Sequence, residues 1–185
     1  MKRQAAASAI DLLFLDEAEA RTHPYLAHCW ARRGADLRIE APGQAKRRAL
    51  LGAFDPIRAE LIVRTGASKR STDFVDLLDR IGQAYGERGR LKPLVVVMDN
   101  GPIHTSKLTA RALAARPWLT VEWLPKYAPE LNAIERCWRD LKRHHLANRT
   151  FVDADDLDRT IRCAVATLNQ ERQAPHSSAA FLKAA

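Results

Sequence analysis

Three acidic side chains stand out because each is placed where it could bind a metal ion. Asp16 directly follows the apolar run DLLFL, and Asp99 directly follows the apolar run LVVVM. Such runs are typical of buried strands, and in an open α/β sheet the functional sites lie at the carboxyl ends of the strands. Glu135 lies near the start of a predicted helix, beside Ile134 and Trp138, at the border of its apolar stripe. We therefore expect the three carboxylates to converge at one edge of the sheet.

The chemistry that such a group of carboxylates supports is metal-dependent. Three converging carboxylates repel one another unless a cation neutralises them. Hard oxygen ligands with open coordination positions favour Mg²⁺ or Mn²⁺. Two such ions, about 3.5–4 Å apart, would activate a water or a 3′-hydroxyl and stabilise the leaving oxygen of a phosphodiester. A single aspartate at a strand end is more often a turn former, so the prediction depends on all three positions together.

The overall charge favours a polyanionic partner. The chain has 185 residues, with 30 Lys and Arg against 22 Asp and Glu, and its formal net charge is +8. Such an excess is typical of proteins that bind nucleic acid, although it also serves solubility. The helix that contains Glu135 also contains Arg136, Arg139, Lys142 and Arg143. We interpret these four as a track for nucleic-acid phosphates, with a solvated helix face as the alternative.

Composition excludes several classes of protein. Apolar residues make up 46% and charged residues 28% of the chain, which is ordinary for a globular protein and excludes a disordered or fibrous one. No stretch approaches the roughly 20 apolar residues of a membrane span, so we expect no membrane partner. The first apolar run is broken by Asp11 and Asp16, which argues against a secretory signal. Cys29, Cys137 and Cys163 match no zinc or disulfide pattern and predict free thiols in a reducing cytoplasm.

The elements that must position these residues follow from hydrophobic periodicity. Apolar runs predict strands, and apolar residues three or four apart predict helices. We expect a single α/β domain over residues 1–185, with a mixed five-stranded sheet flanked by helices, a core at about 10–146 and a C-terminal helical extension at about 150–185. The predicted strands are 9–16, 48–54, 59–65, 94–98 and 119–124, and the predicted helices are 72–85, 106–115, 132–146 and 153–170.

Three blocks of sequence together resemble the catalytic domain of DDE transposases. They are FLDE at 14–17, VVVMDNGPIHTSK at 95–107 and LPKYAPELNAIERCWRDLK at 124–142. The resemblance is to the bacterial insertion-sequence family six-thirty of the mariner superfamily. That family has a strand-Asp-Asn-x-x-x-His block, followed by a Leu-Pro-x-Tyr-Ser-Pro-(Asp/Glu)-Leu-Asn-Pro-Ile-Glu block. The similarity extends from about Ile10 to Gln170.

The resemblance implies a ribonuclease H-like fold in which Asp16, Asp99 and Glu135 are the catalytic, metal-binding triad. It implies hydrolytic nicking of DNA at transposon ends, followed by attack of the freed 3′-hydroxyl on target DNA, with insertion into a TA dinucleotide. The cofactor would be Mg²⁺ or Mn²⁺, as two ions. The resemblance also implies that the protein acts as a homodimer on DNA. It further implies a bacterial cytoplasmic protein that associates with the nucleoid when it binds DNA.

Three more side chains are candidates for positioning the metal ligands. Asn100 either caps its own loop or supports a ligand. His104 falls on the family's histidine and would contact a phosphate, position a water or make a structural hydrogen bond at the start of a helix. We expect Asn132 to cap the following helix rather than to serve as a direct ligand. Glu17 and Glu19 are expected to be solvated.

The sequence departs from the family pattern in places that do not include the triad. Lys126 stands where proline is usual and adds charge near the DNA, where we expect it to make a contact. Ala128 replaces the usual serine, and Ala133 replaces a proline at the start of the helix, which is tolerable. The family also implies a helix-turn-helix region that reads the transposon ends, and nothing before Asp11 can supply it. A separately encoded helix-turn-helix frame, a truncated copy and an excised domain are three explanations.

Two alternatives to a transposase domain remain open from sequence. One is a ribonuclease H-like nuclease that acts on RNA–DNA hybrids or DNA junctions. The other is an inactive DNA-binding remnant of a decayed transposon. The intact triad of Asp16, Asp99 and Glu135 counts against decay, because random loss would be expected to reach the triad or the core.

Overall fold

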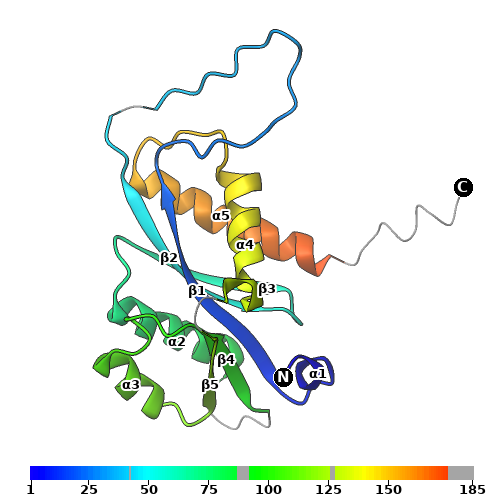
Figure 1. The fold of residues 1–185 in the computed structure, drawn as a ribbon, viewed down its shortest axis with the longest axis vertical. Helices are drawn as coiled ribbons and strands as arrows, with labels where there is room; N and C mark the ends of the chain where they lie inside the picture. The colour runs from blue at the N-terminus through cyan, green and yellow to red at the C-terminus, as the bar shows by residue number, and fades with distance from the viewer. Residues whose placement is uncertain (42, 87–91, 126–127, 175–185) are drawn as a thin grey trace, which may run out of the picture.

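A mixed five-stranded sheet forms the centre of the molecule, as predicted (Figure 1). The computed structural model describes residues 1–41, 43–86, 92–125 and 128–174. The strand order is β3-β2-β1-β4-β5, with antiparallel pairing on one side of β1 and parallel pairing on the other. The strands are β1 (Asp11–Arg21), β2 (Arg47–Asp55), β3 (Glu60–Gly66), β4 (Leu94–Met98) and β5 (Leu119–Trp123).

Helices cover both faces of the sheet (Figure 1). Two of them contribute to the core on one face, and two more, joined to a π-helical segment, contribute to the core on the other. The first face is covered by α2 (Ser71–Tyr85) and α3 (Lys107–Ala114), and the second by α4 (Ile134–Asp140), the π-helix η2 (Leu141–Leu146) and α5 (Ala154–Gln173). The short helix α1 (Lys2–Ala6) contacts β1, and the 3₁₀ turn η1 (Pro129–Leu131) precedes α4.

Side chains of β1 alternate between these two cores. Phe14 packs with the residues of α4 and α5, whereas Leu13 and Leu15 pack with those of α2. Successive residues of a strand point to opposite faces. Asp16 therefore faces the side covered by α4, and Glu17 faces the side covered by α2.

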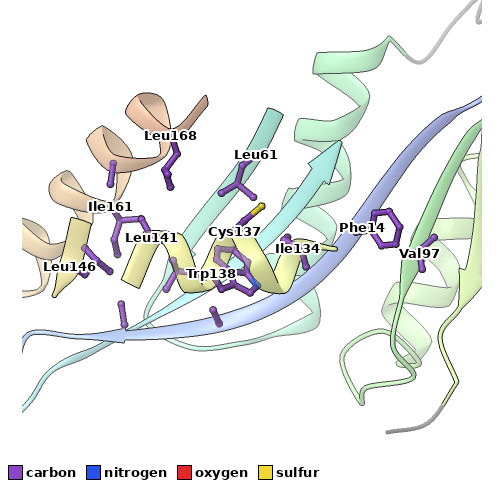
Figure 2. Packing of buried hydrophobic residues seen from close by; sticks show 14 of the residues in the cluster. Phe14, Leu61, Val97, Ile134, Cys137, Trp138, Leu141, Leu146, Ile161 and Leu168 are labelled. Atoms are coloured by element: carbon purple, nitrogen blue, oxygen red, sulfur yellow. The ribbon is translucent and has the colours of Figure 1, made fainter. Parts of the chain in front are cut away.

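Close packing brings α4 down onto the sheet beside Asp16. Figure 2 shows Ile134, Trp138 and Leu141 turned toward the buried cluster on this face. Gly52 is the β2 residue paired with Asp16, and a Cβ atom there would lie 2.5 Å from the Trp138 ring. A side chain at this position would push the helix away, so the glycine allows α4 to approach the strand that carries Asp16.

The first strand is longer than its apolar run predicts. The sequence predicts a strand over 9–16 that ends at Asp16, but β1 continues to Arg21. Pairing with β4 does end near the predicted point, at Phe14 opposite Val97, whereas pairing with β2 continues to Arg21. Asp16 therefore lies inside a strand, just beyond the point where the parallel pairing stops.

The predicted helix over 132–146 forms as two different segments. The α-helix begins at Ile134, and the residues from Leu141 to Leu146 are π-helical. A π-helix bonds residues five apart, so residues at that separation lie one above the other. Leu141 and Leu146, which are five apart, are both buried in the same cluster.

The last helix has a well-defined start. The Asp153 carboxylate accepts hydrogen bonds from the backbone N–H groups of Asp155 (2.9 Å) and Asp156 (2.7 Å), which caps α5. The end of the predicted C-terminal extension, residues 175–185, lies outside the described residues. Across the described ranges, no helix is both long enough and apolar enough to cross a membrane.

Candidate active site

The three predicted carboxylates line one cavity. Asp16 from β1, Asp99 from the residue after β4 and Glu135 from the first turn of α4 all contribute to the wall of a cavity of about 440 Å³. The fold thus brings together three residues from distant parts of the chain. In the described part of the chain, no group of three His, Cys, Asp or Glu side chains is gathered tightly enough to hold a metal ion as it stands. The carboxylates surround the cavity without closing on one point.

Asp16 shows the electrostatic effect of this arrangement. Its pKa is raised from 3.8 to about 7. Burial is the largest cause, and the negative charges of Glu135, Glu17 and Asp99 also raise the pKa, against a hydrogen bond from the backbone of Glu17. A divalent cation would relieve this repulsion, and carboxylate oxygens are the hard donors that Mg²⁺ and Mn²⁺ prefer. The donor set therefore fits such an ion.

Asp99 is held on one side by two hydrogen-bond donors. Its Oδ1 atom accepts from the backbone N–H of Gly101 (2.9 Å) and lies 2.8 Å from Nδ1 of His104. A Cβ atom at position 101 would lie 3.0 Å from the same oxygen, so glycine lets the turn fold tightly under the carboxylate. Because Oδ1 is engaged, Oδ2 is the oxygen left for a ligand.

His104 is buried behind Asp99 and is not part of the cavity wall. Its Nε2 atom lies 2.8 Å from Oε1 of Glu17, and its ring packs 4.7 Å from the ring of Phe74. Burial works to lower the pKa of His104, but the contact and negative charge of Glu17 and the hydrogen bonds to Asp99 outweigh it, so the pKa lies above its usual value. Of the roles considered for His104, this environment fits a structural hydrogen bond rather than contact with a phosphate.

The prediction that Glu17 is solvated is wrong. Its side chain is only 15% exposed, and it contacts His104. The signal that could have found it is its position, since the residue after Asp16 on a strand buried on both faces must point into the second core. Glu19 is more exposed and pairs with Arg21 at 2.9 Å.

The asparagines occupy different places around the cavity, which both of them line. Asn100 is exposed. Asn132 does not cap α4 as predicted, because the N-cap residue is Ala133; instead its Nδ2 donates a hydrogen bond to the backbone oxygen of Leu15 (3.1 Å). That oxygen can only accept, so the amide group is oriented with Oδ1 on the other side. Asn132 Oδ1 is buried and has no hydrogen-bond partner among the described residues.

The evolutionary relationship follows from comparison with known proteins. A model of the family described as DDE superfamily endonuclease matches residues 11–158. The chain belongs to this family. A curated relative of this DDE endonuclease is an uncharacterised 39 kDa protein of the insertion element IS630 from Shigella sonnei, which is 32% identical over 130 residues. The match covers 70% of the present chain but 37% of that relative, so the chain corresponds to a part of it.

Solved structures share the fold of this DDE endonuclease at low sequence identity. The Mos1 transposase paired-end complex with the left transposon end is 15% identical, with a TM-score of 0.61 over 93% of this chain and 56% of that chain. The isolated catalytic domain of Mos1 mariner transposase has a TM-score of 0.58 at 15% identity, and covers 93% and 83% of the two chains. The catalytic core domain of BIV integrase has a TM-score of 0.51 at 15% identity over 87% and 82%. The fold is therefore ribonuclease H-like, as expected.

Basic side chains flank the carboxylate of the DDE endonuclease on α4. Arg136, Arg139 and Arg143 are exposed, and Lys142 is half-buried. Three of them line a second cavity of about 470 Å³ together with Glu135. The four basic residues predicted to contact phosphates therefore lie on the same helical segment as Glu135, three of them exposed to solvent. Lys126, the remaining predicted DNA contact, lies outside the described residues.

Proposed function

We propose that this chain is the catalytic domain of a DNA transposase. It hydrolyses phosphodiester bonds at transposon ends and joins the freed 3′-hydroxyl to target DNA. The observation that carries this proposal is the single cavity surrounded by Asp16, Asp99 and Glu135 in a member of the DDE superfamily endonucleases. Solved structures of similar fold include a Mos1 paired-end complex with a transposon end and a Mos1 strand transfer complex, which supports DNA as the substrate.

The cofactor in this proposal is Mg²⁺ or Mn²⁺, as two ions held by Asp16, Asp99 and Glu135. The raised pKa of Asp16 supports this, because like charges are gathered there with no Lys or Arg ion pair to Asp16 or Glu135 in the described ranges. Mos1 paired-end complexes with Mg and with Mn are among the structures of similar fold. When bound, the metal would polarise the phosphate and stabilise the charge on the leaving oxygen.

The chain's own side chains bind and orient the DNA. Arg136, Arg139, Lys142 and Arg143 would contact phosphates beside the cavity, with Lys126 as a further contact from the preceding loop. Phosphate contacts carry no sequence information. Recognition of the ends therefore needs another element, which we propose to be a separately encoded helix-turn-helix frame. Two ends must be joined, so the active form on DNA would be a homodimer.

A nicking assay tests the proposal. The full chain, together with any upstream frame, is incubated with transposon-end DNA and either Mg²⁺, Mn²⁺ or a chelator. We expect nicking at the ends that requires the metal and disappears in Asp99→Ala, while DNA binding in a gel-shift assay largely survives. Arg21→Ala serves as a matched control, since this exposed residue of β1 pairs with Glu19 away from the cavity.

Three results would overturn parts of this assignment. Cutting without metal, or full activity in both Asp99→Ala and Glu135→Ala, would show that the carboxylates around the cavity are not the reactive site. Preferential cleavage of an RNA–DNA hybrid over duplex DNA would favour a ribonuclease H-like nuclease instead. Binding without any cleavage, with intact end sequences and the upstream frame present, would favour an inactive remnant.

A further inference from the structure

The parallel pairing between β1 and β4 stops shortly before Asp16 of β1 and before Asp99, the residue that follows β4. Parallel pairing between β1 and β4 runs from Asp11 opposite Leu94 to Phe14 opposite Val97, and stops there. Beyond this point β1 continues only with β2, while β4 ends at Met98. The sheet ladder therefore does not fix Asp99 relative to Asp16, and the spacing of the two carboxylates must be set by other contacts.

A side-chain bridge spans this gap. It starts at Glu17, the residue after Asp16, whose Oε1 lies 2.8 Å from Nε2 of His104. The opposite nitrogen of the ring, Nδ1, lies 2.8 Å from Oδ1 of Asp99 and 3.0 Å from its backbone oxygen. The contacts with Asp99 are hydrogen bonds and the contact with Glu17 is at ion-pair distance, so both ends of one rigid ring are held. One imidazole thus connects β1 to both the side chain and the main chain of Asp99.

The surroundings of the bridge make it stiff. His104 is 2% exposed and its ring packs on Phe74 of α2, so the ring has little freedom to turn. Glu17 is 15% exposed at its side chain, and water therefore competes weakly for its contact with the ring. Glu17 and His104 are both absent from the wall of the cavity that Asp16 and Asp99 line. Of the three carboxylates, the Glu17–His104 pair contacts only Asp99 through side chains in the described ranges, although the charge of Glu17 also acts on Asp16. Neither residue lies where it could take the place of a ligand.

We propose that Glu17 and His104 form a brace that positions Asp99 for metal binding. Both are positioning residues: the brace fixes Oδ1 of Asp99, and so leaves Oδ2 as the oxygen available to the metal ion. This inference depends on the proposed function, since it concerns the same metal site. It assigns a role to Glu17, whose side chain points away from that site.

Metal affinity measures the brace without relying on turnover. Mn²⁺ binding to the full chain is followed by isothermal titration calorimetry for the wild type, Glu17→Ala, Glu17→Gln and Glu19→Ala. Groups that orient a metal ligand typically change affinity by about 10–100-fold, so we expect Glu17→Ala to bind Mn²⁺ at least about 10-fold more weakly. Glu17→Gln keeps an oxygen that accepts from the ring and should retain affinity within about 3-fold. Glu19→Ala, on the same strand and face, should bind as the wild type does.

A second pair of variants tests whether the two residues act together. In His104→Asn the amide can still donate to Asp99 but cannot reach Glu17. If the brace acts as one unit, adding Glu17→Ala to His104→Asn should weaken Mn²⁺ binding no further. Circular dichroism and thermal unfolding without metal establish that each variant is folded before its affinity is compared.

The outcomes of these experiments test the brace separately from the proposed metal site. If the wild type binds no Mn²⁺, the proposed metal site fails, and the brace fails with it. If the wild type binds Mn²⁺ and Glu17→Ala binds it equally well, the brace is wrong while the metal site stands. Equal losses in Glu17→Ala and Glu17→Gln, or additive losses in the double variant, would also contradict a brace in which Glu17 acts through the His104 ring.

Discussion

The paired strands β1 and β2 pass through two regions that treat charge in opposite ways. In the first region Asp16, opposite Gly52, has carboxylates as its charged neighbours, and its pKa is raised. In the second region Arg48, opposite Ala20, is surrounded by acids of α5. The guanidinium of Arg48 lies 2.9 Å from Asp155 and 3.1 Å from Asp158, and Nε also donates to a backbone oxygen of the same helix.

The contrast between Asp16 and Arg48 separates charges that stabilise the fold from charges that are available to bind a ligand. The chain pairs carboxylates with arginine where α5 docks on the sheet, so it neutralises the half-buried acid Asp158 there. It does not do so at Asp16, where like charges raise the cost of folding. Unfavourable electrostatics that persist in one cavity are typical of functional sites. The two regions should therefore respond to substitution in opposite ways.

The largest expected effect is on catalysis, in the first region alone. Glu135→Gln removes a negative charge with little change in shape, and we expect metal-dependent nicking to fall by about 10³-fold or more, because a metal ion contributes several kcal/mol to such a reaction. Initial rates at saturating Mg²⁺ measure this. Arg48→Met, measured on folded protein, should nick at close to the wild-type rate. A similar loss in both variants would remove the distinction between the regions.

The next effect is on stability and its dependence on pH. In the unfolded chain Asp16 loses its proton near pH 3.8, whereas in the metal-free fold it loses it near pH 7. The folded state thus keeps a proton that the unfolded chain has released, so stability should fall as the pH rises from about 4 to 7. Asp16→Asn should reduce this fall and be more stable than the wild type at pH 8 by roughly 2–4 kcal/mol.

Urea unfolding between pH 4 and pH 8 in the presence of a chelator measures this change. Asp158→Asn is the matched control from the second region, because its carboxylate is paired with Arg48. That variant should be less stable than the wild type at neutral pH. If Asp16→Asn and Asp158→Asn shift stability in the same direction, the contrast between the two regions is wrong.

A smaller effect is expected from breaking the paired region. Arg48→Met leaves Asp158, whose side chain is 17% exposed, without its partner. We expect a loss of about 2–3 kcal/mol in the free energy of unfolding, since a buried charge left unpaired is costly. Adding Asp158→Leu to Arg48→Met should recover part of the loss. Chemical denaturation of the single and double variants tests this, and a double variant that is weaker than both single variants would contradict it.

The smallest effect concerns the reactivity of thiols. Cys29 and Cys163 are exposed, whereas Cys137 of α4 is buried. Burial raises the pKa of Cys137 to about 11, against the nearby positive charge of Arg172, so little thiolate is present at pH 8. A thiol reagent should modify Cys29 and Cys163 promptly and Cys137 slowly. Arg48→Met should speed the slow phase a few-fold by loosening α5, and Glu135→Gln should not.

Local pattern was enough to predict much of the fold. The run Leu94–Met98 is buried at every position and forms β4, because a central strand excludes water from both faces. The helix predicted at 106–115 forms as α3 over Lys107–Ala114, with Ser106 as its N-cap. The strands predicted at 48–54 and 59–65 form β2 and β3, which pair antiparallel on either side of Asp55-Pro56. These features depend on neighbours in sequence, which composition and spacing report directly.

Long-range contacts decided the features that the sequence did not reveal. Residues 17–21 read as polar, yet they form strand because β2 pairs with them. The amide of Asn132 donates to Leu15, far away in the chain, so its expected role as a cap is replaced by a tertiary contact. Glu17 is shielded from solvent for the same reason, because its contact with His104 depends on the turn after β4. A single sequence does not directly report such contacts between residues that are far apart in the chain.

The π-helix at Leu141–Leu146 has a consequence for how this region tolerates change in length. Its wider turn accommodates one residue more than an α-helix would over the same rise. Deleting one residue within it would let regular α-helical winding continue through the segment. Leu141 and Leu146 would then be four positions apart, which is the spacing of one face of an α-helix, so Leu146 would stay in the core. Loss of a single codon should thus be tolerated better here than in the regular helix α5, where it would rotate every later side chain by about 100° around the axis.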